Sequence, residues 1–288
     1  MTSRAENYSS AAAPRAAAIR TRKTRREANA ERYAVARHLY AVLGTTFDVM
    51  QIPDVILQMQ QWIAGRAGCH YVAVTGMHGI TEARHKLEVR QSLSDADLVV
   101  ADGMPVVWIG RFLGYHLPRR VYGPELMLRF CEKTAWAGYR HYFLGGAVGV
   151  PEQLAASLEK SCPGITIVGT YSPPFGSCTP EEDAAIVENI NRADADVLWV
   201  GLGTPKQEIW MREHRDKLRI PVMVGVGAAF DLLSSRKKQA PEWMRERGLE
   251  WLFRLLQEPQ RLWKRYLVGG SEFVLSVALE LMGLHRFE

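Results

Sequence analysis

Asp102 is the first residue in this sequence whose type and position suggest chemistry. It follows the apolar run 98–101 and precedes Gly103, which leaves room for a ligand to approach. A carboxylate at the end of a strand is placed to act as a general base. The position is equally typical of an Asp that caps the next turn, so this residue alone leaves both roles open.

A glycine-rich segment at residues 145–149 lies between the apolar run 141–144 and a helical pattern that begins at Pro151. The backbone N–H groups of such a loop, together with the start of the helix, can hold a diphosphate. A nicotinamide dinucleotide would require an acid at the end of the next strand. The next run, 165–169, continues into residues 170–173 without an acid, which disfavours an NAD-dependent oxidoreductase.

Two Asp-Ala-Asp triplets, at 95–97 and 194–196, match the pairs with which many metal-dependent transferases hold a cation on a diphosphate. Both precede an apolar run, so we expect them at the sheet edge opposite the ligand, as helix ends or solvated groups. We therefore predict no metal and no cofactor. A leaving diphosphate would then need positive side chains to stabilise its charge. Four arginines are candidates for this role: Arg120, Arg254, Arg261 and Arg265.

Short apolar runs alternate with longer amphipathic segments between about residues 45 and 239. Continuous Val/Ile/Leu runs separated by helices of ten or more residues indicate parallel strands that are covered on both faces. The predicted fold class is α/β, a doubly wound, mainly parallel Rossmann-like sheet with a C-terminal helical appendage. The expected strands are 71–75, 98–101, 141–144, 165–169, 197–201 and 222–226. The expected helices are 53–64, 80–93, 124–137, 151–161, 181–193 and 207–218.

Such a sheet binds its ligand beyond the carboxyl ends of its strands. Four of the predicted strands are followed by segments rich in glycine and polar residues, at 102–103, 145–149, 203–208 and 227–231. One such loop would be routine, but four at one edge predict a ligand cleft.

The positive charge is concentrated at the two ends of the chain. The net charge is +5, yet residues 1–40 carry nine Lys/Arg against three acids, and residues 236–266 carry nine against four. The first segment is expected to be a basic, flexible tail, and residues 41–239 to form the α/β core. In residues 240–288, basic side chains alternate with Trp, Phe and Leu, which suits helices in a membrane interface. Docking on the core or on another subunit, giving a homo-oligomer, explains that pattern as well.

The protein is expected to be cytoplasmic and peripheral on the inner face of the cytoplasmic membrane. No stretch reaches the roughly eighteen apolar residues needed to span a bilayer, and the N-terminus lacks the apolar core of a secretory signal. The four cysteines form no CxxC pair, and nothing in their spacing requires disulfides. No nucleic-acid-reading motif accompanies the basic ends, so we expect no nucleic acid partner.

Several motifs occur in an order that resembles one known family. They are Asp-Gly-Met-Pro at 102–105, Arg-Val-Tyr-Gly-Pro-Glu-Leu at 120–126, Gly-Thr-Pro-Lys-Gln-Glu at 203–208, Gly-Ala-Ala-Phe-Asp at 227–231 and Leu-Glu-Trp-Leu-Phe-Arg-Leu at 249–255. Over about residues 47–268 the chain is similar to the WecG/TagA/CpsF family of bacterial glycosyltransferases.

The resemblance implies an inverting transferase. The donor would be a UDP-sugar carrying a hexose or N-acetylhexosamine, and the acceptor a polyprenyl-diphosphate-linked sugar used for cell-surface or exopolysaccharide synthesis. Asp102 matches the family's proposed base, and the C-terminal appendage would complete the site at the membrane. The substrate-binding residues expected from the loops and the resemblance are Thr75, Gly103, Arg120, Gly145, Gly146, Gly203, Lys206, Gln207, Glu208, Asp231, Arg254, Arg261 and Arg265.

One position departs from the family. Many members have Thr-x-Asn after the first core strand, whereas Gly76 stands here where the Asn would be, with Thr75 and His78 nearby. The departure leaves the donor sugar open. A non-catalytic nucleotide-sugar-binding scaffold of a polysaccharide assembly complex is the alternative function, and an NAD-dependent oxidoreductase is the weaker one.

Overall fold

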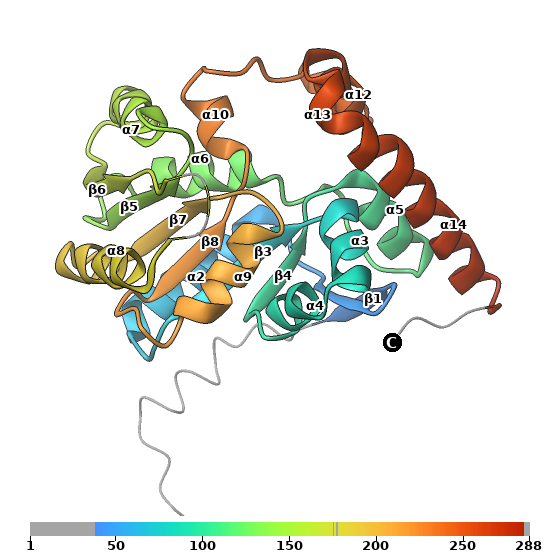
Figure 1. The fold of residues 1–288 in the computed structure, drawn as a ribbon, viewed down its shortest axis with the longest axis horizontal. Helices are drawn as coiled ribbons and strands as arrows, with labels where there is room; N and C mark the ends of the chain where they lie inside the picture. The colour runs from blue at the N-terminus through green and yellow to red at the C-terminus, as the bar shows by residue number, and fades with distance from the viewer. Residues whose placement is uncertain (1–37, 175, 177, 285–288) are drawn as a thin grey trace, which may run out of the picture. The chain divides into compact units, whose positions relative to one another are not determined.

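The computed structural model describes residues 38–174, 176 and 178–284. Most of the predicted basic tail, 1–40, therefore lies outside the described residues. The main sheet has six parallel strands in the order β4-β3-β8-β7-β5-β6 (Figure 1). All six were predicted: β3 His70–Thr75, β4 Leu98–Ala101, β5 Arg140–Gly145, β6 Thr166–Tyr171, β7 Val197–Gly201 and β8 Val222–Gly225.

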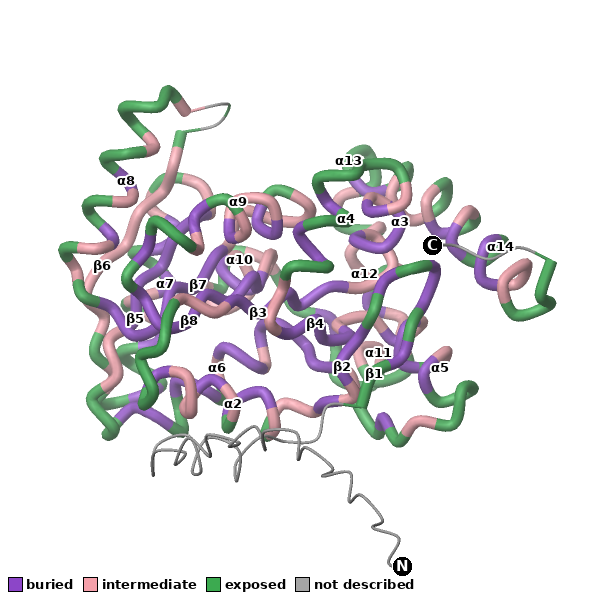
Figure 2. The backbone as a smooth tube through the Cα atoms, turned by 90° about the horizontal axis from the view of Figure 1, so that it is seen from below, coloured by how far each residue is buried: buried purple, intermediate pink, exposed green. Residues whose placement is uncertain are grey.

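Both faces of this sheet are covered, which confirms the doubly wound prediction. On one face, α2 (Ile52–Gly65), α6 (Gly123–Thr134) and α7 (Val150–Ser161) pack on strand residues such as Trp199. On the other, α3 (Met77–His85), α4 (Leu87–Ser94), α8 (Pro180–Arg192) and α9 (Lys206–His214) cover residues such as Leu198. Neighbouring strand residues thus point into different cores, and Figure 2 shows the strands buried between the helices.

Three elements differ from the prediction. The predicted helix 80–93 is two helices, α3 and α4, because Lys86 between them is extended, with φ −127° and ψ 113°. A hairpin of β1 (Leu39–Val42) and β2 (Thr45–Asp48) and the helix α5 (Met104–Phe112) were not predicted. The hairpin is fixed to the sheet by Asp48, which accepts a hydrogen bond of 2.9 Å from the Val99 N–H.

The chain after residue 240 forms α11 (Glu242–Glu246), α12 (Glu250–Gln257), α13 (Pro259–Trp263), a π-helical turn at Lys264–Val268 and α14 (Gly269–Leu281). No single helix spans the stretch from Pro241 to Pro259. The stretch is interrupted at Gly248, whose φ of 73° is left-handed, a conformation that favours glycine.

The last helix, α14, packs on the core. Arg84 of α3 contacts Glu272 at 3.1 Å, and Glu280 accepts a hydrogen bond of 3.0 Å from the Leu43 N–H. The docking expected as one explanation of the C-terminal pattern is therefore present. Within the described part of the chain, none of the helices combines the length and the apolar character that crossing a bilayer requires.

Candidate active site

A cleft of about 1350 Å³ opens at the carboxyl ends of the strands. The segments after β4, β5, β7 and β8 all contribute to its lining, as predicted from the four polar loops, and α12 and the π-helical turn contribute as well. Of the predicted site residues, nine line the cleft: Asp102, Gly146, Gly203, Lys206, Gln207, Asp231, Arg254, Arg261 and Arg265. The other five, Thr75, Gly103, Arg120, Gly145 and Glu208, lie outside its lining.

Asp102 directly follows β4, and its carboxylate is held by a backbone N–H group. Its Oδ1 accepts a hydrogen bond of 3.2 Å from the Gly123 N–H at the start of α6. Burial raises the pKa of the Asp102 carboxyl above its usual range, Arg120 opposes this rise, and Glu250 adds to it. A carboxyl that faces a cleft with a raised pKa has the properties of a general base.

Arg120 belongs to the wall beside Asp102. Its guanidinium forms an ion pair with Glu250 of α12, lies 4.1 Å from the centre of the Tyr122 ring, and donates to the Asp102 carbonyl at 3.2 Å. Tyr122 also donates its hydroxyl to Glu250 at 3.0 Å. Although burial opposes it, the charges of Asp102 and Glu250 raise the pKa of Arg120, so the guanidinium stays charged.

These contacts give Arg120 a different place from the one predicted. Its guanidinium is occupied by Glu250, and it positions the segment around Asp102 without lining the large cleft. Sequence reasoning missed Glu250 and Tyr122. In the sequence, Glu250 is visible as a single acid at the start of an apolar and basic helix. Its partner Arg120 could not be inferred from this, because Arg120 lies 130 positions earlier.

Two arginines of the appendage, Arg254 and Arg265, face the cleft. Arg254 and Arg265 form no ion pair with any described residue, and the Arg265 Nε is buried with no hydrogen-bond partner in the described part of the chain. Burial, together with the positive charge of Arg254 and Arg261, lowers the pKa of Arg265. An anion bound here would relieve that repulsion, so the arrangement favours a phosphate or diphosphate.

Arg261 and Asp231 also line the cleft, but each has an intramolecular partner. Arg261 contacts Glu258 through its Nε at 2.5 Å, and Asp231 contacts Lys237 at 3.0 Å. Lys237 also reaches Glu258 at 3.0 Å, so these four side chains form one network at the mouth of the cleft.

The loop after β5 approaches β7 closely. A Cβ at Gly145, whose φ is 127°, would lie 2.5 Å from the carbonyl carbon of Gly201, so only glycine fits. Gly146 then donates its N–H to the Gly201 carbonyl at 3.1 Å and lines the cleft. The loop ends at Gly149, the N-cap of the twelve-residue helix α7. The first turn of this helix offers few free donors, because the Val150 N–H donates to the Ala147 carbonyl at 2.9 Å and Pro151 has no N–H.

Gln207 and Glu208 at the start of α9 are almost fully buried. The Gln207 amide accepts from the Gly227 N–H at 2.9 Å and donates to Glu208 at 3.1 Å, which fixes its orientation between two cleft loops. Glu208 also accepts from the Thr204 hydroxyl at 2.9 Å, and burial raises the pKa of its carboxyl. Among the described residues, the Oε2 atom of Glu208 and the buried Oγ1 of Thr75 have no hydrogen-bond partner.

His78 lies two positions after Gly76, which stands where many family members have an Asn. Its side chain is half-buried at the start of α3. Burial and the nearby Arg265 lower its pKa to about 4, so the ring is neutral at pH 7. Gly76 itself packs against Gly103. A Cβ at Gly76 would lie 3.1 Å from the Gly103 nitrogen, next to Asp102.

The Asp-Ala-Asp triplets lie at the amino ends of the strands, as expected. Asp97 accepts from the Tyr71 N–H at 3.0 Å, and Asp196 accepts from the Arg140 N–H at 3.0 Å. Asp196 also binds Arg66 at 2.5 Å, and Asp95 binds Arg212 at 2.6 Å. Their carboxylates therefore stabilise the amino edge of the sheet.

The fold and its basic, carboxylate-bearing cleft are those of an α/β transferase that handles an anionic substrate. The sequence profile of the "Glycosyl transferase WecG/TagA/CpsF family" matches residues 40–286, so the chain belongs to this family. The resemblance found from the motifs is thereby confirmed, together with the prediction of a glycosyltransferase.

Two relatives carry the name N-acetylglucosaminyldiphosphoundecaprenol N-acetyl-beta-D-mannosaminyltransferase. The one from Bacillus spizizenii is 31% identical over 186 residues, which are 65% of this chain and 70% of the relative. The one from Staphylococcus aureus strain MW2 is 29% identical over 226 residues, which are 78% of this chain and 85% of the relative.

Proposed function

We propose that this protein transfers a hexose or N-acetylhexosamine from a UDP-sugar to a polyprenyl-diphosphate-linked sugar, with inversion, in the synthesis of a bacterial cell-surface or exopolysaccharide. The observation that carries the proposal is the cleft, in which Asp102 lies close to the guanidinium groups of Arg254 and Arg265, neither of which forms an ion pair with a described residue. The names of the two relatives support the class of acceptor.

In the proposed reaction, Asp102 takes the proton from the acceptor hydroxyl. The hydroxyl oxygen forms a bond to the anomeric carbon as the bond from that carbon to the diphosphate oxygen breaks. The electron pair of the broken bond leaves with UDP, whose charge would be stabilised by Arg254, Arg265 and the loop at 145–149. We place no metal or cofactor in this reaction.

The membrane side of the proposal rests on the helices after residue 250. Their outer faces expose many large apolar side chains: Trp251, Leu256, Trp263, Leu267, Val268, Val274, Leu275, Leu281 and Met282. We propose that this surface lies in the inner face of the cytoplasmic membrane, where the acceptor is anchored. Val274 and Leu275 are each more than 60% exposed, so replacing both with serine should weaken binding to vesicles without disturbing the core.

The test is UDP release by the full-length protein, with a synthetic polyprenyl-diphosphate-linked sugar and a panel of UDP-hexoses, with and without EDTA. Acceptor-dependent release with one donor, insensitive to EDTA, is the expected result. Asp102→Asn should abolish it. Asp194→Asn, at a side chain 69% exposed on the opposite edge of the sheet, is the matched control and should not.

Three other results would contradict the proposal. Release abolished by EDTA would refute metal-free transfer. An Asp102→Asn variant with more than a few per cent of the wild-type rate would refute the base. UDP binding without turnover for every donor and acceptor would favour the non-catalytic scaffold.

A further inference from the structure

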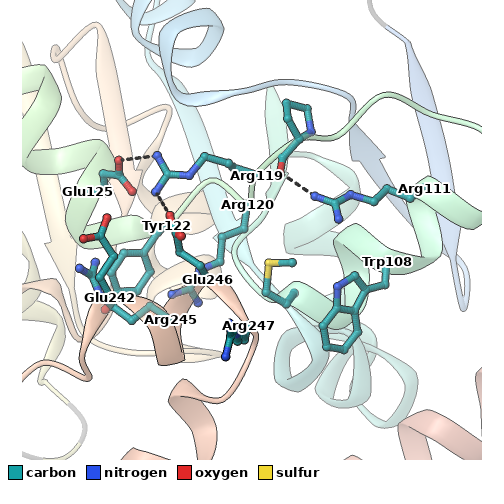
Figure 3. Close-up of a pocket in the computed structure, with 12 residues that line it drawn as sticks. Trp108, Arg111, Arg119, Arg120, Tyr122, Glu125, Glu242, Arg245, Glu246 and Arg247 are labelled. Carbon is teal, nitrogen blue, oxygen red and sulfur yellow. Dashed lines mark hydrogen bonds and ion pairs between the residues drawn. The ribbon is translucent and has the colours of Figure 1, made fainter.

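A second cavity, of about 430 Å³, lies next to the active-site wall and is lined by the side chains shown in Figure 3. Its walls are α5, the segment 118–122 and α11. Tyr122 lines both this cavity and the cleft. Nothing in the reaction described above uses the cavity.

The cavity has a surplus of positive charge. Five arginines and three glutamates line it, but Arg119 binds two of the glutamates, Glu125 at 3.4 Å and Glu246 at 3.2 Å. Arg120 is paired with Glu250, as described above. The three remaining guanidinium groups, those of Arg111, Arg245 and Arg247, face one remaining lining carboxylate, that of Glu242.

These three arginines are also short of strong acceptors. Arg111 donates to the carbonyls of Leu117 at 2.7 Å and Pro118 at 2.6 Å, and not to a carboxylate. The Nε of Arg245 is buried and has no hydrogen-bond partner in the described ranges. Arg247 is exposed and forms no ion pair with a described residue. A buried, unsatisfied guanidinium N–H is costly, and an anionic oxygen would satisfy it.

Exposed aromatic side chains lie on α5 and α11, the two helices that contribute to the cavity walls. Trp108, which lines the cavity, is 47% exposed, and Phe112, one turn later on α5, is 74% exposed. On α11, Trp243 is 55% exposed and stands one turn before Arg247. Half-exposed aromatic rings above a basic floor are typical of surfaces at the level of lipid headgroups.

We propose that this cavity binds the phosphate-bearing headgroup of an anionic membrane lipid, at a site separate from the acceptor. Arg245, Arg247 and Arg111 would hold the phosphate, and Trp108 and Phe112 would rest against the start of the acyl chains. This inference rests on the proposed membrane association and adds to it a specific class of lipid.

The experiment is flotation of the full-length protein with vesicles of phosphatidylcholine alone and of phosphatidylcholine with phosphatidylglycerol. The double variant Arg245→Gln/Arg247→Gln should bind the phosphatidylglycerol vesicles at least about tenfold more weakly than wild type, because losing even one charge-assisted hydrogen bond lowers the affinity by about that factor. Its binding to phosphatidylcholine alone should not change. Arg247→Gln alone alters only an exposed side chain and should give part of the effect.

The matched control is Lys160→Gln/Arg192→Gln, which removes the same charge from exposed positions on α7 and α8. It should bind both kinds of vesicle like wild type. Equal losses in the control and the cavity variant would mean unspecific attraction and would overturn the site, and so would wild-type binding by the cavity variant.

A soluble arm separates this inference from the proposed membrane association. Calorimetric titration with short-chain phosphatidylglycerol should show binding by wild type and none by the cavity variant, and inorganic phosphate should not compete. Competition by phosphate would identify a free-anion site and overturn the lipid assignment. If wild-type protein binds the short-chain lipid but no vesicle, the membrane association is wrong and the lipid site stands. If wild-type protein floats with vesicles but does not bind the short-chain lipid, the lipid site is wrong and the membrane association stands.

Discussion

Replacing Glu250 with alanine removes the acid that holds Arg120 and Tyr122 in the wall of the active site. The Glu250 side chain is 9% exposed and that of Arg120 is 14% exposed, so the pair is shielded from water. Once Glu250 is gone, the Arg120 guanidinium remains buried with no acidic side chain bound to it, and the Tyr122 hydroxyl loses its acceptor.

Breaking a buried ion pair from one side typically costs about 3–5 kcal/mol. For a chain of this size, 1 kcal/mol lowers the melting temperature by about 2–4 °C, so Glu250→Ala should melt about 6–20 °C below wild type. Thermal unfolding followed by circular dichroism measures this shift. UDP release should also fall, because Arg120 no longer fixes the segment around Asp102.

The control is Glu246→Ala, which breaks an ion pair with Arg119 in which both side chains are more than half exposed. Such pairs are worth about 0–1 kcal/mol, so this variant should melt close to wild type. If Glu250→Ala and Glu246→Ala have the same melting temperature, the active-site wall does not depend on a buried ion pair and the reasoning is wrong. The double variant Arg120→Met/Glu250→Leu should recover much of the lost stability, because it removes both buried charges.

Three further predictions concern the cleft. Burial raises the pKa of Asp102, so the folded protein favours the protonated carboxyl. This contribution to the unfolding free energy is lost as the pH rises through the pKa that Asp102 has in the folded state. The Asp102→Asn variant should therefore match wild-type stability in acid and exceed it at neutral pH, which melting curves across pH would measure. Its turnover should fall about 10²–10⁴-fold, which the UDP-release assay would measure. Gly76→Ala places a Cβ 3.1 Å from the Gly103 nitrogen, so it should lower kcat and reduce the unfolding free energy by about 1 kcal/mol. The control is Gly65→Ala, where a Cβ meets nothing within 4 Å and neither quantity should fall. Burial also raises the pKa of Glu208 and so favours its uncharged form. Glu208→Gln should therefore keep stability and turnover, whereas Glu208→Ala should lower both by releasing the Gln207 amide. Equal losses in the two variants would contradict this reasoning.

The strands of the sheet could be predicted because strands covered on both faces must be continuously apolar. The runs at 98–101 and 197–201 match β4 and β7 at both ends. The break between α3 and α4 could not be predicted, because Lys86, whose extended backbone interrupts the helix, is neither glycine nor proline. The helix α5 was missed because its short apolar run follows Asp-Gly and contains Pro105 at the second position, which looks like a loop.

The site was predictable where the chemistry lies at the end of a strand and less so where it depends on distant contacts. Asp102 and the glycine-rich loop after β5 follow directly from strand positions and the parallel sheet. The role of Arg120 did not, because its side chain turns to Glu250, a residue of another element. The basic cavity beside α5 escaped notice for the same reason, since its arginines come from three separate segments.

The pairing of Arg120 with Glu250 also sets an order of events during synthesis. The sheet, Asp102 and Arg120 all precede α12 in the chain, and the contact spans 130 positions. A nascent chain, or one cut short before α12, can therefore place its strands while Arg120 still lacks its acid. Translation must pass α12 before the wall of the active site can close, so a chain that ends earlier holds Asp102 and the sheet without a completed site.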